Sequence, residues 1–268
     1  MRMSMNELTT YGWAFEEDVY QYVRSGIPAM GVWRQKLADY GDEAGVRLLV
    51  ESGIAVSNLF WAGGFTGTDG RSLGETIDDA LEAIQLANCM DADCLVFYTG
   101  SQGGHTANHS WRLAKDAFVE LTQVAEALQV TLAVEPLHSN CAGKWTYMTE
   151  LEDAQKMIEQ VRSEQLKLVF DTFHFGHVDL PRLEAMADRI AIVYLGDRRQ
   201  TPCSEQNRCL LGEGELPLDE LACSLTSGGY DGFFDVKLRG RDVERHTYDH
   251  ILEHSKGMVE KIEAVVSR

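Results

Sequence analysis

Three short stretches of this sequence place ionisable side chains at the expected ends of buried strands. "AVEPLH" contains Glu135 and His138, "VFDTFHFGH" contains Asp171 and His174, and "FFDVKL" contains Lys237. Two carboxylates that converge on one point repel each other unless a cation lies between them. Oxygen-rich sites with a histidine suit Mg, Mn or Zn, so a metal is one candidate cation. The ammonium group of Lys237 is the other.

Each of these acids also has a purely structural interpretation. A carboxylate at the end of a strand can cap the helix that follows, and neither Glu135 nor Asp171 would then do chemistry. The pair favours a site, because two such acids on neighbouring strands would meet at one edge of the sheet. The sequence therefore predicts Glu135, Asp171 and Lys237 as the residues for proton transfer.

Aromatic residues accompany these acids. Trp13, Trp33 and Trp61 fall at or just after expected strand ends, and Tyr194 lies in "IAIVYLGD". Aromatic faces pack on the C–H surfaces of sugars, so Trp13 could form a wall of a sugar site, although core packing is an equally good explanation. Tyr194 is a candidate hydrogen-bond donor to substrate.

Two further motifs are weaker. His246, His250 and His254 repeat every four residues on the last expected helix, which we interpret as a solvated face far from the strand ends. "TGSQGGHT" (99–106) is glycine-rich after a strand, but it lacks the lysine and the spacing of a phosphate-binding loop. We expect a flexible loop over the pocket there.

Short apolar runs alternate with helical stretches along the whole chain. We expect strands at 8–13, 29–33, 54–60, 94–100, 130–136, 166–171, 190–197 and 232–238. We expect helices at 15–26, 41–53, 74–90, 109–128, 149–162, 181–188, 217–228 and 243–266. Most strands are continuously apolar, which is typical of parallel strands covered on both faces. The pattern predicts an α/β (β/α)₈ TIM barrel as one domain over residues 1–268. A doubly wound open sheet is the alternative, but no glycine-rich fingerprint follows the first expected strand.

Composition excludes several classes of function. The formal charge of −18 in 268 residues argues against a nucleic-acid partner, which would require a basic face. No apolar run approaches the length of a membrane helix, so we expect no membrane partner. The N-terminus lacks the apolar core of a signal peptide, and none of the six cysteines forms a C-x-x-C pair. A redox pair of Cys203 and Cys209 is conceivable. Cytoplasmic localisation with reduced thiols is the default expectation.

The order of four motifs resembles the xylose-isomerase-like barrels, a family that includes sugar isomerases and epimerases. The motifs are "EPLH", "DTFH", a stretch from Asp197 through Arg208 to "LGEGELPL", and "GGYDGFF" before the last strand. The resemblance extends over nearly the whole chain. It implies a TIM barrel with its pocket at the carboxyl ends of strands five to eight, a carbohydrate-like small-molecule substrate and, in many members, a homo-oligomer. A DNA-repair endonuclease with the same fold is less similar, because its many zinc-binding positions are not filled here.

The resemblance also implies a divalent metal (Mg, Mn or Zn) held by Glu, Asp, His and Glu. Glu135 and Asp171 match the first two positions, whereas the third is Tyr194 and the fourth is Lys237. His174 and Arg208 match residues that contact substrate in the family, and His138 lies close by in sequence. With Lys237 as the cation in place of the metal, the site would keep the same total charge.

Three interpretations remain open. The first is a sugar or polyol isomerase or epimerase that moves protons next to a carbonyl without the usual metal. The second is a metal-dependent isomerase in which Glu135 and Asp171 bind the ion together with His174, His138 or water. The third is a barrel that binds a small polar molecule without turnover, since fold does not fix function.

Overall fold

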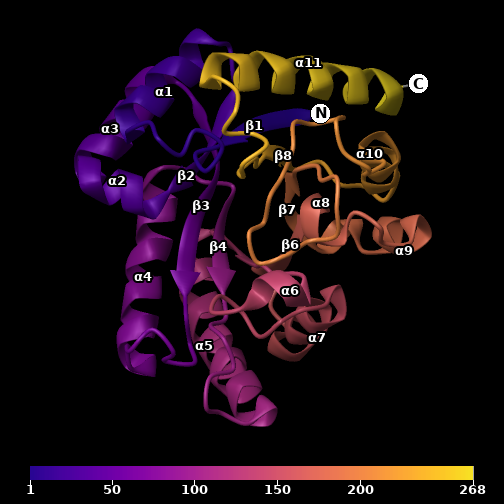
Figure 1. Ribbon diagram of the computed structural model, residues 1–268. Coiled ribbons are helices and arrows are strands. Elements are labelled where there is room, and N and C mark those ends of the chain that lie inside the picture. The colour runs from indigo at the N-terminus through magenta and orange to yellow at the C-terminus, as the bar shows by residue number, and fades with distance from the viewer. Residues whose placement is uncertain (268) are drawn as a thin grey trace.

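The computed structural model describes residues 1–267, and its strands form a closed, entirely parallel barrel. Strand order follows chain order, and β8 pairs with β1 to close the barrel (Figure 1). The strands are β1 (Arg2–Asn6), β2 (Ala29–Trp33), β3 (Ala55–Gly63), β4 (Cys94–Tyr98), β5 (Thr131–Val134), β6 (Leu166–Asp171), β7 (Ile190–Leu195) and β8 (Phe233–Val236). The predicted (β/α)₈ barrel is thus confirmed, and the open-sheet alternative was wrong.

Burial on both faces explains why the strands read as continuous apolar runs. All five residues of β4 and all four of β8 are buried. Alternate side chains point into the barrel or out against the helices, so neither set contacts water. This arrangement leaves the carboxyl ends of the strands as the place where polar side chains can meet.

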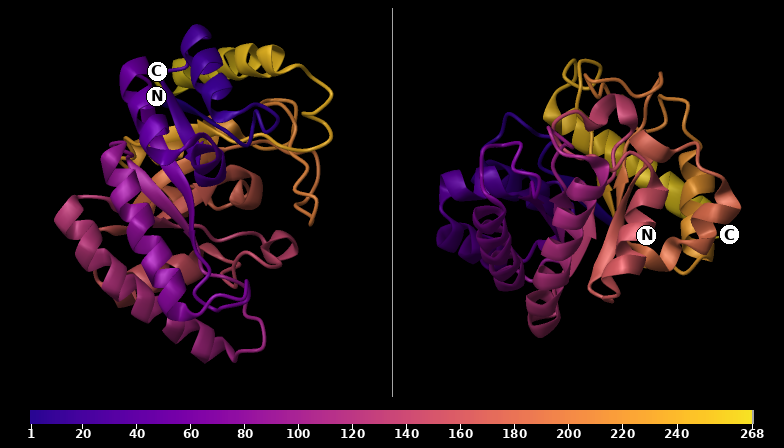
Figure 2. Two further views of the ribbon diagram at one scale, coloured as in Figure 1. Left: turned by 90° about the vertical axis from the view of Figure 1, so that its left-hand side faces the viewer. Right: turned by 90° about the horizontal axis from the view of Figure 1, so that it is seen from below.

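Helices surround the barrel on its outer side (Figures 1 and 2). They are α1 (Phe15–Arg24), α2 (Arg34–Tyr40), α3 (Asp42–Ser52), α4 (Leu73–Cys89), α5 (Ala107–Leu128), α6 (Ser139–Ala142), α7 (Leu151–Val161), α8 (Thr172–Phe175), α9 (Leu180–Ala185), a 3₁₀ turn η1 (Ala187–Arg189), α10 (Leu218–Ser227) and α11 (Tyr248–Val266). The sequence did not predict α2, α6 or α8, which are short. Two of these, α6 and α8, directly follow the acids of the candidate site.

The first strand was predicted in the wrong place. The sequence predicted residues 8–13, but β1 is Arg2–Asn6, and residues 7–12 form turns after it. Ser4 and Asn6 made this segment look polar, yet both point into the barrel and donate hydrogen bonds to Asp235 of β8, at 2.5 and 2.7 Å. Because its polar side chains are paired internally, β1 is buried at four of its five positions. Trp13 therefore lies well beyond the end of a strand.

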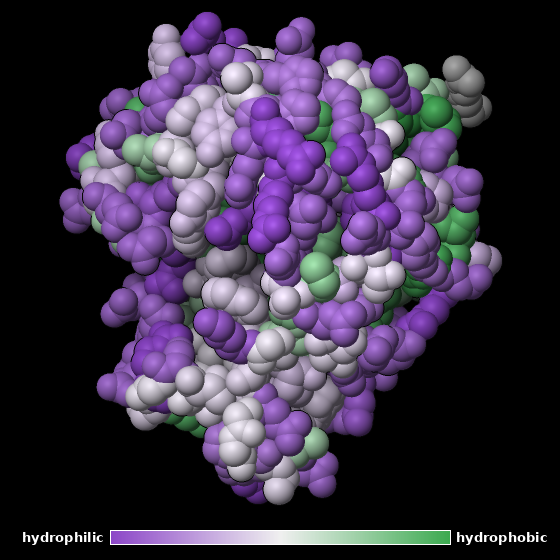
Figure 3. Space-filling view, viewed as in Figure 1, coloured by the Kyte–Doolittle hydropathy of each residue, from purple (hydrophilic) through white to green (hydrophobic). Residues whose placement is uncertain are grey.

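The exterior agrees with the acidic, polar composition. Hydrophilic side chains dominate the face seen in Figure 3. Within residues 1–267, no helix combines the length and apolar character needed to cross a membrane. All six cysteines are free thiols, so Cys203 and Cys209 are not joined in this structure.

Candidate functional site

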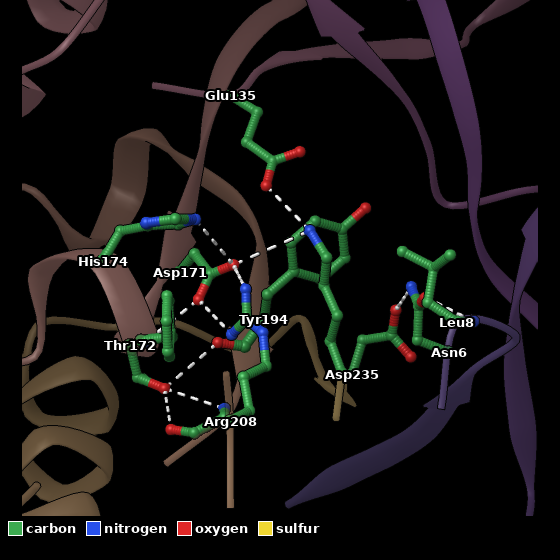
Figure 4. A network of polar contacts seen from close by, with 12 residues as sticks. Asn6, Leu8, Glu135, Asp171, Thr172, His174, Tyr194, Arg208 and Asp235 are labelled. Carbon is green, nitrogen blue, oxygen red and sulfur yellow. Dashed lines mark hydrogen bonds and ion pairs between the residues drawn. The ribbon is translucent and has the colours of Figure 1, made fainter. Parts of the chain in front are cut away.

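Glu135, Asp171, His174, Arg208 and Lys237 meet at the carboxyl ends of β5 to β8, and we call them the mouth cluster. Glu135 directly follows β5, Asp171 ends β6, and Lys237 directly follows β8. His174 comes from α8, and Arg208 comes from the long segment between β7 and α10. Figure 4 shows the polar ends of Glu135, Asp171, His174 and Arg208 pointing toward a common region. The structure thus brings together five of the residues predicted from sequence.

Two cations neutralise the two carboxylates of the mouth cluster. Lys237 Nζ donates to Glu135 Oε1 at 2.8 Å and lies 3.6 Å from Asp171 Oδ2. Arg208 binds both oxygens of Asp171, at 3.0 and 2.9 Å, and its guanidinium carbon lies 4.2 Å from the centre of the Phe173 ring. Bidentate pairs of this kind fix geometry as well as charge. The four formal charges sum to zero.

The two acids are equally buried but have different affinities for protons, because their neighbouring cations differ. Glu135 and Asp171 are both fully buried, and Lys237 is 5% exposed. Burial raises the pKa of Glu135, and the nearby Lys237 ammonium opposes that rise. Burial also disfavours ionisation of Asp171, but the charges of Arg208 and Lys237 and the hydrogen bonds from Arg208 outweigh it and hold the pKa of this carboxyl well below its usual range. Glu135 is therefore the better proton acceptor of the pair.

Several polar atoms of the mouth cluster have no partner among the described residues. These are Oε2 of Glu135 and both ring nitrogens of His174. Burial, together with the charges of Arg208 and Lys237, lowers the pKa of His174 to about 3 despite the opposing effect of Asp171, so its ring is neutral at pH 7. A buried polar atom without a hydrogen bond costs about 1–3 kcal/mol. Such atoms side by side indicate a place where a polar ligand completes the hydrogen bonds.

Tyr194 lies beneath Lys237, and its hydroxyl points away from the mouth of the barrel. The centre of its ring is 3.8 Å from Lys237 Nζ, while its hydroxyl donates to Asn58 Oδ1 at 3.0 Å. Asn58 Nδ2 in turn donates to Asp235 Oδ2 at 2.9 Å. The sequence predicted a hydrogen bond from Tyr194 to substrate, but in this structure the ring stabilises the ammonium and the hydroxyl is used inside the barrel.

Asp235 was not predicted from the sequence. It is two residues before Lys237 on the same inward face of β8, and Ser4, Asn6 and Asn58 donate to it. Burial raises the pKa of Asp235 to about 6, although these donors oppose the rise. The period of two along a strand was the signal that could have placed Asp235 directly below the cluster.

His138 and Trp13 lie at the edge of this arrangement. His138 caps α6, and its Nδ1 accepts from the backbone N–H of Asn140 at 3.2 Å. Trp13 packs edge-on against Tyr248, with ring centres 4.8 Å apart, and lines a separate cavity beside α1 and α2. Their predicted contacts with substrate remain predictions.

His246, His250 and His254 form no metal site in the part of the chain that the structure describes, and only the last two lie on α11, which begins at Tyr248. Their rings lie in a row, and His254 Nε2 is 2.9 Å from the carbonyl oxygen of Leu211. Over residues 1–267, no group of three or more His, Cys, Asp or Glu side chains is arranged to hold a metal ion. The predicted helix face therefore holds for His250 and His254, whereas His246 precedes the helix.

The mouth cluster does not fit the divalent metal that the family resemblance implies. The ammonium group of Lys237 lies between Glu135 and Asp171, where an ion would have to bind both. Both oxygens of Asp171 already accept from Arg208. Protonated Tyr194 at the third ligand position is a poor ligand for hard divalent ions, and its hydroxyl points elsewhere.

Two loops meet beside the mouth cluster. Asn140 Nδ2 donates to the carbonyl of Pro202 at 3.1 Å, and Cys141 Sγ donates to the carbonyl of Cys203 at 3.0 Å. These bonds join the segment after β5 to the segment that carries Arg208. A substrate that reaches the buried cluster requires movement of these loops or entry from the side.

A second buried cluster of acids and a lysine was missed by the sequence analysis. We call Glu7, Asp18, Lys36, Thr10 and Tyr22 the side cluster, which lies between β1 and helices α1 and α2. Lys36 Nζ donates to Asp18 Oδ2 at 2.5 Å and to the backbone carbonyls of Glu7 and Thr10 at 3.3 and 3.0 Å. Glu7 Oε2 accepts from the backbone N–H of Trp33 at 2.5 Å. Glu7 lies within the segment that was assigned no role because the first strand was misplaced.

Comparison with known proteins places this geometry in context. A family model described as "Xylose isomerase-like TIM barrel" matches residues 20–261. An inosose isomerase of Bacillus velezensis is 27% identical over 161 residues, which cover 57% of this chain and 54% of that protein. A D-psicose 3-epimerase of Enterocloster bolteae is 28% identical over 116 residues, which cover 42% of this chain and 35% of that protein. These matched segments span about half, or less, of the curated relatives.

Solved structures share the fold at low identity. The crystal structure of the IOLI protein with a bound zinc atom superposes with a TM-score of 0.85 at 20% identity, covering 100% of this chain and 98% of that one. At this level of identity, the likeness shows the fold alone.

Proposed function

Because this chain belongs to the xylose isomerase-like TIM barrel family, we propose that it is a carbohydrate isomerase or epimerase that moves a proton next to a carbonyl group. The single observation that carries the proposal is the buried pair of Glu135 and Lys237. An acceptor with one unpaired oxygen lies 2.8 Å from a fixed cation. The isomerase and epimerase names of the relatives support the same class of reaction.

Each residue of the mouth cluster has a role in this proposal. Glu135 removes the proton from the carbon next to the carbonyl, and burial makes its carboxylate a stronger base. The electrons of that C–H bond form an enolate, whose oxygen gains negative charge. Lys237 stabilises that oxygen with its ammonium group, and neutral His174 donates a ring N–H to it. Return of the proton to the neighbouring carbon, with the hydroxyl proton of the first carbon passing to the enolate oxygen, gives an isomer. An epimer requires a second donor on the opposite face of the first carbon; in this proposal the Lys237 ammonium gives that proton, and Glu135 returns its own proton to the amine.

Asp171 and Arg208 form an ion pair that keeps the site electrically neutral and fixes the positions of its side chains. Asp171 Oδ2 lies 3.6 Å from Lys237 Nζ, so its negative charge attracts the ammonium group and holds it beside the base. Arg208 fixes Asp171 in turn and offers its remaining N–H groups to substrate oxygens. We propose that these residues position the substrate and the base.

Lys237 replaces the family's metal ion in this proposal. Two carboxylates and two cations already sum to zero, so a divalent ion would add an uncompensated charge of two. At about 4 Å and an effective dielectric near 20, a dication and an ammonium repel by about 8 kcal/mol. The fixed ammonium supplies the stabilisation of negative charge that a metal would otherwise supply.

Proton exchange in D₂O tests the proposal without knowledge of the natural product. The protein is incubated with a panel of ketoses and inososes, and deuterium next to the carbonyl is detected by mass spectrometry and NMR. We expect exchange with at least one member, and we expect EDTA to leave its rate unchanged. Glu135→Gln removes the base and should abolish exchange, whereas Glu7→Gln, in the side cluster, is the matched control. Absence of exchange over the whole panel, or equal rates in Glu135→Gln and wild type, would reject the proposed reaction.

A further inference from the structure

A cavity of about 300 Å³ opens beside the mouth cluster, on the side of β3 and β4. It is enclosed by aromatic rings, glycine backbone and a few charged side chains: Trp61, Ala62, Gly63, Gly64, Thr68, Asp69, Arg71, Asp79, Tyr98, Gly100, Lys144 and Trp145. Ligand sites in proteins begin at about this size. The proposed proton transfer uses none of these residues directly.

Two of the lining residues also border the mouth cluster. The ring of Trp61 lies 5.9 Å from Lys237 Nζ. Burial raises the pKa of Tyr98, and the negative charge of Glu135 raises it further, so this phenol lies in the field of the base. The cavity is therefore next to the mouth cluster, and Trp61 borders both.

Three aromatic rings form one wall of the cavity. Trp61, Tyr98 and Trp145 have ring centres 5.1–5.7 Å apart, with interplanar angles of 35–46°. Trp145 is 44% exposed, although large aromatic side chains usually gain from complete burial. Its backbone is nevertheless fixed, because its carbonyl accepts from Gly100 at 2.9 Å and its N–H donates to Ala142 at 2.8 Å. The wall is thus preformed and open to a flat apolar partner.

The polar wall of the cavity suits neutral hydroxyl groups. Arg71 pairs with Asp69 at 2.7 Å and with Asp79 at 3.1 Å, and it donates to the carbonyl of Gly63 at 2.8 Å. Trp61 Nε1 is buried and has no hydrogen-bond partner among the described residues. These groups offer donors and acceptors with little net charge. Arg71 and Lys144 balance the charges of Asp69 and Asp79, so the cavity has no excess positive charge with which to hold a phosphorylated substrate.

We propose that this cavity is a subsite for the second ring of a glycoside, so that the substrate is a sugar joined to another neutral ring. The inference rests on the proposed function for the placement of the reacting sugar at the mouth cluster. Aromatic faces cover the C–H surface of the second ring, while the polar wall and Trp61 Nε1 bind its hydroxyl groups. A free monosaccharide would leave the subsite, and the exposed face of Trp145, uncovered.

Matched glycosides test the subsite directly. Glucose, galactose, mannose, xylose and fructose are each compared as methyl and phenyl glycosides, together with cellobiose and maltose, by calorimetry and saturation-transfer NMR. For at least one sugar we expect the phenyl glycoside or the disaccharide to bind about tenfold more tightly than the methyl glycoside, which corresponds to about 1.4 kcal/mol. Trp145→Ala should reduce this ratio to about one without changing the binding of the methyl glycoside.

Trp111→Ala is the matched control, because Trp111 lies on α5 and bonds to Gln160 rather than lining the cavity. The subsite is rejected if no phenyl glycoside or disaccharide binds more tightly than its methyl counterpart, or if the preference survives in Trp145→Ala. Deuterium exchange is followed separately with cellobiose, maltose and the ketose and inosose panel, which keep a carbonyl group, because methyl and phenyl glycosides have none that could react. Preferential binding without exchange rejects only the proton transfer, and exchange without preference rejects only the subsite.

Discussion

The mouth cluster and the side cluster use the same residue types for different purposes. Each contains two buried carboxylates and one lysine, with the ammonium at hydrogen-bond distance from one carboxylate. In the side cluster, the ammonium group of Lys36 also donates to two backbone carbonyls, and Thr10 donates to Asp18 at 2.5 Å. In the mouth cluster, Lys237 instead contacts the faces of Tyr194 and Trp61.

Location and unpaired atoms separate the two clusters. The mouth cluster lies at the carboxyl ends of β5 to β8, where TIM barrels bind substrates, and its three unpaired atoms belong to two polar groups, the Glu135 carboxylate and the His174 ring. Within the described residues, the side cluster has one buried polar atom without a hydrogen bond, Oε1 of Glu7. Its residues join β1 to α1 and α2. The comparison teaches that a buried ion pair becomes a candidate for catalysis when its bonds are left incomplete at the mouth of the barrel.

The largest expected difference between the clusters is the loss of turnover when the glutamate of each is replaced by glutamine. Glu135→Gln should lower kcat for proton exchange by about 10²–10⁴-fold, the usual contribution of a general base. Glu7→Gln should leave kcat within about twofold, since that residue faces the helices. Exchange rates of both variants, measured per mole of folded protein, check this prediction. Equal losses would mean that the clusters do not differ in role.

Replacement of either lysine should lower the stability of the protein, but only replacement of Lys237 should lower its activity. Lys237→Met and Lys36→Met each leave a buried carboxylate without its cation, which costs about 3–5 kcal/mol of unfolding free energy. Only Lys237→Met should also lose proton exchange. Urea unfolding and exchange rates at a temperature where both variants are folded test the comparison. Full exchange activity in Lys237→Met would remove this residue from the mechanism.

Tyr194→Phe should have a moderate effect on stability alone. The variant keeps the ring beneath Lys237 but leaves Asn58 Oδ1 buried without its donor, at a cost of about 1–3 kcal/mol. Exchange activity should stay within about threefold of wild type, because the hydroxyl does not reach the substrate in this account. A large loss of activity with unchanged stability would instead support the hydrogen bond to substrate that the sequence suggested.

The smallest expected effect is a pH dependence that arises in the side cluster. Burial and the charge of Asp18 raise the pKa of Glu7, and burial raises the pKa of Asp18 to about 6 against the opposing charge of Lys36. An acid whose pKa is higher in the folded state stabilises the protein at low pH and loses that contribution as the pH rises through the folded-state value. Glu7→Gln should therefore gain stability relative to wild type as the pH rises above about 4.3, the usual pKa of a glutamate in an unfolded chain.

The effect has the opposite sign at the mouth of the barrel. The pKa of Asp171 is lowered, so this residue contributes stability above its unfolded pKa of about 3.9 and loses it as the pH falls. Denaturant unfolding of wild type and Glu7→Gln, repeated at a series of pH values from acidic to neutral, measures both pH dependences. A difference between the two proteins that stays constant with pH would contradict the raised pKa of Glu7.

The sequence predicted the barrel and most of the mouth cluster because local patterns determine both. Apolar runs mark strands, and in a parallel barrel the residue at a strand end must lie at one mouth. The pairing of Arg208 with Asp171 is different, because it joins positions 37 residues apart through an irregular loop. No periodicity fixes the path of such a loop.

The errors have a common physical cause. β1 was missed, and Asp235 with it, because Ser4, Asn6 and Asp235 satisfy one another inside the barrel and look like surface residues in sequence. The orientation of Tyr194 likewise depends on Asn58, which comes from a distant strand. Polar groups that pair across a barrel interior leave no signal in any one segment.

Metal stoichiometry of wild type and Lys237→Glu most directly tests the central claim that an ammonium replaces the family's ion. Both untagged proteins are equilibrated with Mg, Mn or Zn, freed of unbound ions, and measured by elemental analysis and by thermal unfolding, since an ion that binds the native state raises Tm. We predict no bound ion and no shift of Tm in wild type, and about one ion per chain in Lys237→Glu, whose added carboxylate removes the repulsion. One ion per wild-type chain, lost in Glu135→Gln, would contradict the account.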